Sequence, residues 1–370
     1  MLLFTPGPTP VPEEVRVAMA APTIHHRTPE FEKIFSLARE GLFRLFRMDE
    51  AVVLASSGTG AMEASILNVA KKKVLTINAG KFGERFSKIV KAFNFDLKEL
   101  KYEWNEPAKV EDVIQAIKSD RDIDTIAIQV CESAGGLRHP VEDIAKAVKE
   151  IDKDIAIVAD GITAVGVEEI DTSNIDVLIA GSQKALMLPP GLAMIGLSNY
   201  AIDRIGDGRG YYFNLKSEIS KQRKNTTAYT AATTLIIGLN KIFELIEKEG
   251  GLKELYKKTY ARGVATREAL EEIGYKIYPK APALAMSAIE DLQSEEIRGI
   301  LKKEFRVNVA GGQDHLKGKI FRINNMGLIE NQDIEWVINS LELIASRLKG
   351  IKYKARGVEV FNQKFLELYG

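Results

Sequence analysis

The amino-acid sequence predicts an α/β fold: a mostly parallel sheet covered by helices, followed by a smaller C-terminal α+β domain. Up to about residue 235, short runs of branched apolar residues alternate with amphipathic stretches. Such runs are typical of parallel strands, because both faces of a parallel sheet are buried. Beyond that point, long helical patterns and only short strand-like stretches follow.

The predicted large domain begins with an amphipathic helix and continues with alternating strands and helices. Apolar residues recur at helical spacing over 31–47. Runs of apolar residues predict strands at 51–55, 74–77, 125–130, 155–159 and 177–180. The segments between them predict helices near 60–70, 82–93, 109–118 and 140–150.

The pattern of predicted elements changes in the second half of the chain, where long helices replace the regular alternation of strands and helices. It carries helical patterns at 235–249, 252–273 and 331–347 and strand-like stretches at 284–286, 307–309 and 320–323. We therefore expect a proline-rich extended N-terminal arm over 1–20, a large domain over 21–250 and a small domain over 251–350. The tail over 351–370 has no role that the sequence indicates.

The composition excludes several classes of protein. Lys+Arg and Asp+Glu both number 51, and this balance weighs against a nucleic-acid binder. One cysteine makes no intramolecular disulfide, and the four histidines lack metal-ligand spacing, so no metal site is expected. No apolar run has membrane-spanning length, and the first residues lack the pattern of a signal peptide, so we expect a cytoplasmic protein without membrane contact.

Two residues at the ends of neighbouring predicted strands suggest chemistry. Asp160 comes directly after the run 155–159, and Lys184 follows the run 177–180. Ligands of parallel sheets bind at such carboxyl ends. An aspartate there also serves as a turn cap, and a lone lysine is more often a solvated surface charge. The apolar residues after Lys184 favour a lowered pKa, and such an amine forms a Schiff base with an aldehyde.

A third feature is a turn that suits an anion. Ser57, Gly58 and Thr59 lie between the strand 51–55 and the helix near 60–70. Backbone N–H groups at such a helix start attract phosphate, although the same residues also make plain helix caps. Neither a P-loop nor a GxGxxG motif is present, which counts against a Rossmann oxidoreductase.

Together with the Pro-Gly-Pro-Thr arm at Pro6 and the segment Phe321–Ile323, these features resemble the class V (fold type I) pyridoxal-phosphate aminotransferases. The chain is most similar to the alanine–glyoxylate, serine–glyoxylate and serine–pyruvate group, over nearly its whole length. The resemblance implies a seven-stranded-type sheet, pyridoxal 5′-phosphate bound by the large domain, and a homodimer with composite active sites.

The resemblance also implies roles for individual residues. Lys184 would hold the cofactor and move a proton, Asp160 would pair with the pyridinium nitrogen, and Arg322 would clamp the substrate α-carboxylate. Tryptophan is common in the family where Phe82 stands, and alanines replace two prolines near Thr227. The remaining cofactor contacts would be Ser57, Gly58, Thr59 and Gln183 at the phosphate, Phe82 and Ile162 on the ring faces, Ser133 beside the ring, and Thr227 at the partner subunit's phosphate.

The expected reaction is ping-pong transamination from alanine or serine to glyoxylate or pyruvate. The main alternative is aspartate or phosphoserine as donor with 2-oxoglutarate. In that case His26 and Arg27 would bind the second anionic group of the substrate; the alternative interpretation is that these two residues only fix local structure. A non-catalytic interaction protein on the same fold is the alternative of another class.

Cys131 is expected to pack at a strand end and not to act as a nucleophile, because the cysteine desulfurases carry their nucleophile in the C-terminal part of the chain.

Overall fold

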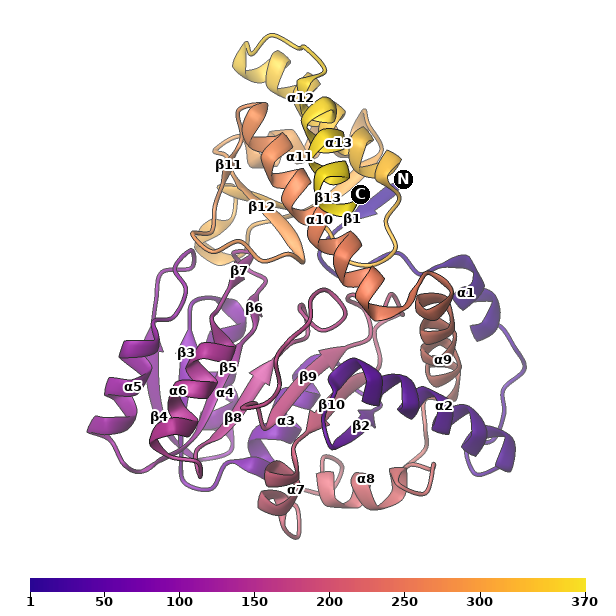
Figure 1. Cartoon of the computed structure of the whole chain (residues 1–370), viewed down its shortest axis with the longest axis vertical. Coiled ribbons are helices and arrows are strands. Elements are labelled where there is room, and N and C mark those ends of the chain that lie inside the picture. The colour runs from indigo at the N-terminus through magenta and orange to yellow at the C-terminus, as the bar shows by residue number, and fades with distance from the viewer.

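The computed structural model describes residues 1–370, and a seven-stranded sheet forms its larger part (Figure 1). All neighbouring strands are parallel except β10, which is antiparallel to β2 and β9. This confirms the predicted α/β fold with a mostly parallel sheet. The strand order is β2 (Glu50–Leu54), β10 (Ala193–Leu197), β9 (Val177–Gly181), β8 (Ala156–Asp160), β5 (Ile123–Gln129), β3 (Lys73–Asn78) and β4 (Asp96–Lys101).

Alternate residues of these strands belong to two hydrophobic cores, one on each face of the sheet. Val53 joins the core on one face, and its neighbours Val52 and Leu54 join the other. The first face is covered by α2 (Pro29–Phe46), α5 (Val110–Ser119), α6 (Val141–Ile151) and α9 (Thr233–Lys248). The second face is covered by α3 (Gly58–Val69), α4 (Lys81–Ala92), α7 (Asn199–Ile205) and α8 (Leu215–Gln222).

A five-stranded sheet forms the smaller part, which lies above the large sheet in Figure 1. The chain begins in this part, because β1 pairs in parallel with β13. We propose to divide the domains at the start of α10. The strand order is β1 (Leu2–Phe4), β13 (Val307–Gly311), β14 (Ile320–Asn324), β12 (Met286–Glu290) and β11 (Lys276–Ile277), and the helices are α10 (Gly251–Glu272), α11 (Ser294–Lys303), α12 (Asn331–Lys349) and α13 (Arg356–Tyr369).

Several elements were not expected from the sequence. The edge strand β4 reads Asp-Leu-Lys-Glu-Leu-Lys and lacks the apolar run of a buried strand. The strand β10 begins two residues after Pro189–Gly191, and Gly196 interrupts its short apolar run. The strand expected at 284–286 instead covers Met286–Glu290. The other unexpected elements are α1 (Glu13–Met19) within the arm, α7, α8, α11, α13, β1, β11, the ribbon of β6 (Cys131–Glu132) and β7 (Leu137–Arg138), and the short 3₁₀-helix η1 (Asp314–Leu316).

The C-terminal tail has a structural role. Glu342 of α12 accepts hydrogen bonds from the backbone N–H groups of Lys354, Arg356 and Gly357, at 3.0, 3.1 and 3.0 Å. This carboxylate satisfies N–H groups at the start of α13, as a helix N-terminus requires. Phe361 of α13 is then fully buried in the core of the small part. None of the helices combines the length and apolar composition that crossing a membrane requires.

Replacing Phe361 with alanine is expected to lower the free energy of unfolding by about 3–5 kcal/mol, because it leaves a cavity in a packed core. Denaturant unfolding measures the change. Leu366 of the same helix is 67% exposed, so Leu366→Ala is the matched control, with an expected effect within about 0.5 kcal/mol. Equal effects of the two substitutions would show that α13 is not docked as described.

Candidate active site

Asp160 and Lys184 lie at the same edge of the large sheet. Asp160 is the last residue of β8 and pairs with Ile179 of the parallel strand β9. Lys184 follows the end of β9 by three residues. The charges are close enough that Lys184 lowers the pKa of Asp160 and Asp160 raises that of Lys184. The structure therefore brings together the two residues that the sequence placed at strand ends.

The N-terminal arm covers Lys184. The Thr9 hydroxyl donates to the Lys184 carbonyl at 2.7 Å, and the Lys184 amine donates to the Pro6 carbonyl at 2.5 Å. Gly7 adopts a φ of +96°, and a Cβ there would lie 2.6 Å from Cδ of Lys184. Burial lowers the pKa of Lys184 to about 8, and the charge of Arg322 adds to this effect. Roughly a tenth of the amine is therefore unprotonated at pH 7, far more than for a lysine of ordinary pKa.

Asp160 is a buried carboxylate. Its Oδ1 accepts the backbone N–H of Ile162 at 2.9 Å. Burial raises the pKa of Asp160 to about 6, although this hydrogen bond and the charges of Arg85 and Lys184 act in the opposite direction. A cationic partner at this position would favour the ionised form further.

The turn before α3 presents an open helix N-terminus. Ser57 is the N-cap residue but makes no capping hydrogen bond, and the first turn carries no acidic residue. Its N–H groups and dipole therefore remain available to an anion. Ile162 packs closely on this turn: a Cβ on Gly58 would lie 2.4 Å from Cδ1 of Ile162. Glycine at position 58 thus allows the Asp160 loop to approach the turn.

Glu132 holds the segment that carries Phe82. Its Oε2 accepts the N–H groups of Phe82 and Gly83 at 2.9 and 3.0 Å, and its Oε1 accepts that of Ala134 at 3.0 Å. The side chain is fully buried, and burial raises the pKa of Glu132 to about 7 against these hydrogen bonds. Glu132 has no role predicted from the sequence; the available signal was a carboxylate directly after the apolar strand run 125–130 and Cys131.

Arg322 reaches from β14 of the small sheet to the large domain. Its Nη1 donates to the Ser133 carbonyl at 2.6 Å, and its Nη2 donates to the Gly311 carbonyl at 2.7 Å. All of its hydrogen bonds go to backbone carbonyls, so no carboxylate pairs with the guanidinium directly, although the charge of Glu132 acts on it. Burial lowers the pKa of Arg322 to about 10, and the group stays charged at neutral pH. Arg322 is thus a buried cation and not an exposed strand charge.

Three predicted site residues make no hydrogen bond to Asp160, Lys184 or Arg322. The Thr227 hydroxyl donates to the carbonyl of Tyr229, two residues further along the chain, at 2.5 Å. His26 and Arg27 lie in the exposed segment before α2, where the rings of His25 and His26 are 4.7 Å apart. Their roles stay predictions, and that of Thr227 depends on a second subunit.

Cys131 is buried as the first residue of the short strand β6, two residues after β5 ends, and it lies close to Lys184 and Glu132. Burial raises the pKa of this thiol far above its ordinary value. The thiol therefore stays protonated, which does not suit a nucleophile.

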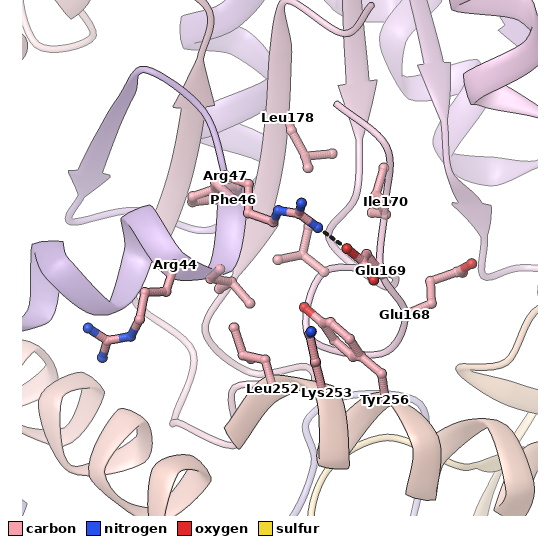
Figure 2. Close-up of a pocket in the computed structure, with 12 residues that line it drawn as sticks. Arg44, Phe46, Arg47, Glu168, Glu169, Ile170, Leu178, Leu252, Lys253 and Tyr256 are labelled. Carbon is pink, nitrogen blue, oxygen red and sulfur yellow. Dashed lines mark hydrogen bonds and ion pairs between the residues drawn. The ribbon is translucent and has the colours of Figure 1, made fainter. Parts of the chain in front are cut away.

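A separate cavity of about 310 Å³ lies between the end of α2, the start of α10 and the loop after β8 (Figure 2). Figure 2 shows Arg47 paired with Glu169 there, and Tyr256 rising from α10 toward them. None of the predicted site residues lines this cavity. We therefore place the candidate site at Lys184 and not in this cavity.

The residues around Lys184 fit pyridoxal phosphate. The amine with a lowered pKa suits the aldehyde, the Asp160 carboxylate suits the ring nitrogen, and the open start of α3 suits the phosphate. Gln183 adds a further polar group, because its Oε1 is buried and has no hydrogen-bond partner in the chain.

Replacing Asp160 with asparagine is expected to raise the Tm of the cofactor-free protein at pH 7.5. Asparagine keeps the acceptor for the Ile162 N–H but removes a carboxylate whose pKa rises from 3.8 to about 6 on folding. Because the folded state binds the carboxyl proton of Asp160 more tightly than the unfolded state does, wild-type stability falls as the pH rises from 3.8 to about 6. The difference in Tm should therefore disappear below about pH 4.

Thermal unfolding at pH 4 and 7.5 measures this effect. Asp152 is the matched control, because its Oδ1 also accepts a backbone N–H two residues further on, at 2.9 Å, but the residue is exposed. Asp152→Asn should leave the Tm unchanged at both pH values. A lower Tm for Asp160→Asn at pH 7.5 would contradict the prediction.

The chain matches the family described as "Aminotransferase class-V" over residues 1–339. An uncharacterized aminotransferase of Helicobacter pylori is 46% identical over 370 residues, which cover 100% of this chain and 99% of the relative. A serine–glyoxylate aminotransferase of Hyphomicrobium methylovorum is 28% identical, covering 95% and 91%. The crystal structure of an aspartate aminotransferase of subgroup IV from Thermus thermophilus superposes with a TM-score of 0.87 at 29% identity, covering 95% and 100%.

The family match extends over both sheets, and the fold of the Thermus structure covers nearly the whole chain. These similarities agree with the lysine, aspartate and open helix start that meet at the edge of the large sheet. The chain belongs to the class V aminotransferases and is an enzyme of fold type I that depends on pyridoxal phosphate.

Proposed function

We propose that the enzyme moves the amino group of a small L-amino acid, alanine or serine, to glyoxylate or pyruvate by a ping-pong mechanism. One observation carries the proposal: the buried guanidinium of Arg322, which has no direct ion-pair partner, bonds to the Ser133 carbonyl, in the segment next to Lys184 and Asp160. An α-carboxylate is the natural partner of such a group. The relative named serine–glyoxylate aminotransferase supports the choice of substrates.

When bound, pyridoxal phosphate supplies an aldehyde that condenses with amino groups and a ring that withdraws electrons. In the proposed site, Lys184 and Asp160 hold its aldehyde and ring nitrogen. Ser57, Gly58 and Thr59 hold its phosphate at the start of α3, with Gln183 beside them. Phe82 and Ile162 confine the ring, and Ser133 borders it.

Lys184 is the proposed acid–base catalyst. With a pKa of about 8, the free amine is basic enough to take the proton from Cα of the bound amino acid and weakly basic enough to give it back. The arm at Pro6–Thr9 limits the motion of this side chain and its access to water. In the second half-reaction the same amine works in the reverse direction on the 2-oxo acid.

Arg322 is the proposed carboxylate clamp. Its guanidinium is fixed by two backbone carbonyls, so little conformational entropy is lost when substrate binds. A bidentate carboxylate contact would orient Cα of the substrate toward Lys184. The predicted homodimer, with Thr227 at the partner's phosphate, completes the proposal.

A second candidate donor is aspartate, because the Thermus structure of 29% identity is described as an aspartate aminotransferase. A second carboxylate, or the phosphate of phosphoserine, requires a further cation. In the single chain, His26 and Arg27 lie in an exposed segment and make no hydrogen bond to the site residues. We therefore rank the neutral donors first.

The absorption spectrum of the purified protein tests the proposed function. With pyridoxal phosphate bound to Lys184, we expect a band near about 400–430 nm that fades toward about 330 nm when a true donor is added. Alanine or serine should bleach it faster than aspartate or phosphoserine. The reverse order would favour the anionic donors, and the absence of any band would favour a non-catalytic protein on this fold.

Replacing Arg322 with lysine is expected to raise KM for the amino donor by about 10–100-fold, because lysine cannot make the bidentate contact. The cofactor band should persist. Steady-state kinetics measures KM. Arg262→Lys is the matched control: Arg262 is also buried, bonds only to the Asn325, Gly327 and Ile329 carbonyls and the Thr259 hydroxyl, and has its pKa lowered to about 10. Its replacement should lower Tm but leave KM unchanged; equal effects on KM would refute the clamp.

A further inference from the structure

Arg85 connects the first turns of the two helices that border the proposed site. Its Nη1 donates to the Thr59 hydroxyl of α3 at 2.9 Å. Its guanidinium carbon lies 4.7 Å from the ring centroid of Phe82, one turn earlier on α4, within the range of a cation–π contact. Thr59 and Phe82 are 23 residues apart in the sequence, and Arg85 contacts both.

This arginine has no ion-pair partner. The neighbouring Glu84 pairs with Lys81 and Lys88, at 3.9 and 2.8 Å. The only hydrogen bond of Arg85 goes to a neutral hydroxyl, although the side chain is half-buried. No side chain forms an ion pair with this charge, and the carboxylate whose pKa it lowers is the buried Asp160 of the proposed site. The guanidinium is therefore available to act on groups of that site.

The direction of the hydrogen bond determines what Thr59 does. Because the Arg85 N–H donates to Oγ1, the hydroxyl proton of Thr59 remains free to donate elsewhere. A hydroxyl that accepts a bond from a cation is also polarised into a stronger donor. Thr59 lies in the first turn of α3, where the N–H groups attract a phosphate.

We propose that Arg85 is a positioning residue for cofactor binding: it orients and polarises the Thr59 hydroxyl toward the phosphate and fixes the Phe82 ring. This inference rests on the proposed phosphate site. The charge of Arg85 also acts on the buried Asp160, at the other end of the same site. The guanidinium thus acts on three groups of the proposed site: the Thr59 hydroxyl, the Phe82 ring and the Asp160 carboxylate.

A double-mutant cycle on cofactor affinity tests the proposal. The Kd of cofactor-free enzyme for pyridoxal phosphate is measured for wild type, Arg85→Met, Thr59→Val and the double variant. Each single substitution should weaken binding by at least about tenfold. Because most of the effect of Arg85 passes through Thr59, and only its contact with Phe82 remains when Thr59 is replaced, the double variant should be no more than about threefold weaker than the weaker single variant. If the double variant weakens binding by the product of the two single-variant factors, or if Arg85→Met leaves the Kd unchanged, the proposal is overturned.

Controls separate positioning from plain stabilisation. Arg209 lies over Phe95 at 5.5 Å, away from the proposed site, so Arg209→Met removes a similar contact and should leave the Kd unchanged. Arg85→Lys keeps the charge and should recover part of the affinity; it replaces Arg85→Met in the cycle if the latter does not fold. A wild-type protein without a cofactor band overturns the proposed function and this inference together, whereas a normal band with an unaltered Arg85→Met Kd overturns only the inference.

Discussion

The pairing of β8 with β9 is the constraint on which the site depends. It brings the Asp160 carboxylate and the Lys184 amine, of opposite charge, to one buried edge of the sheet. Burial raises the pKa of the first to about 6 and lowers that of the second to about 8. Both groups therefore titrate close to neutral pH, which is useful for proton transfer but unfavourable for stability. The two cores on the faces of the sheet supply the apolar burial that offsets this cost.

Around this pair, backbone groups hold the charged side chains in place. Arg322 is fixed by carbonyl groups and Glu132 by N–H groups, so neither forms a direct ion pair with a side chain. Backbone partners also tie the small sheet to the large one, since Arg322 of β14 bonds to the carbonyl of Ser133. A substrate carboxylate bound at Arg322 would thus contact both parts of the molecule.

The N-terminal arm contributes to the same arrangement. β1 belongs to the small sheet through β13, whereas Thr9 bonds to the backbone of Lys184 in the large domain. Between them, Gly7 has the positive φ that brings the arm against the lysine side chain without a Cβ. The position of Lys184 therefore depends on both sheets and on the segment that joins them.

Most of the large sheet, the two charged residues at its edge and the turn before α3 could be predicted from the sequence, because apolar periodicity and chain order are local properties. It did not reveal β4 and α13. β4 is a charged edge strand, and α13 is held by Glu342 and the buried Phe361. Nor did it reveal Glu132 under Phe82 or Arg85 on Thr59, since these contacts join residues 50 and 26 positions apart. These contacts form only in the folded chain, because the partners of a buried polar group come from the fold and not from the neighbouring sequence.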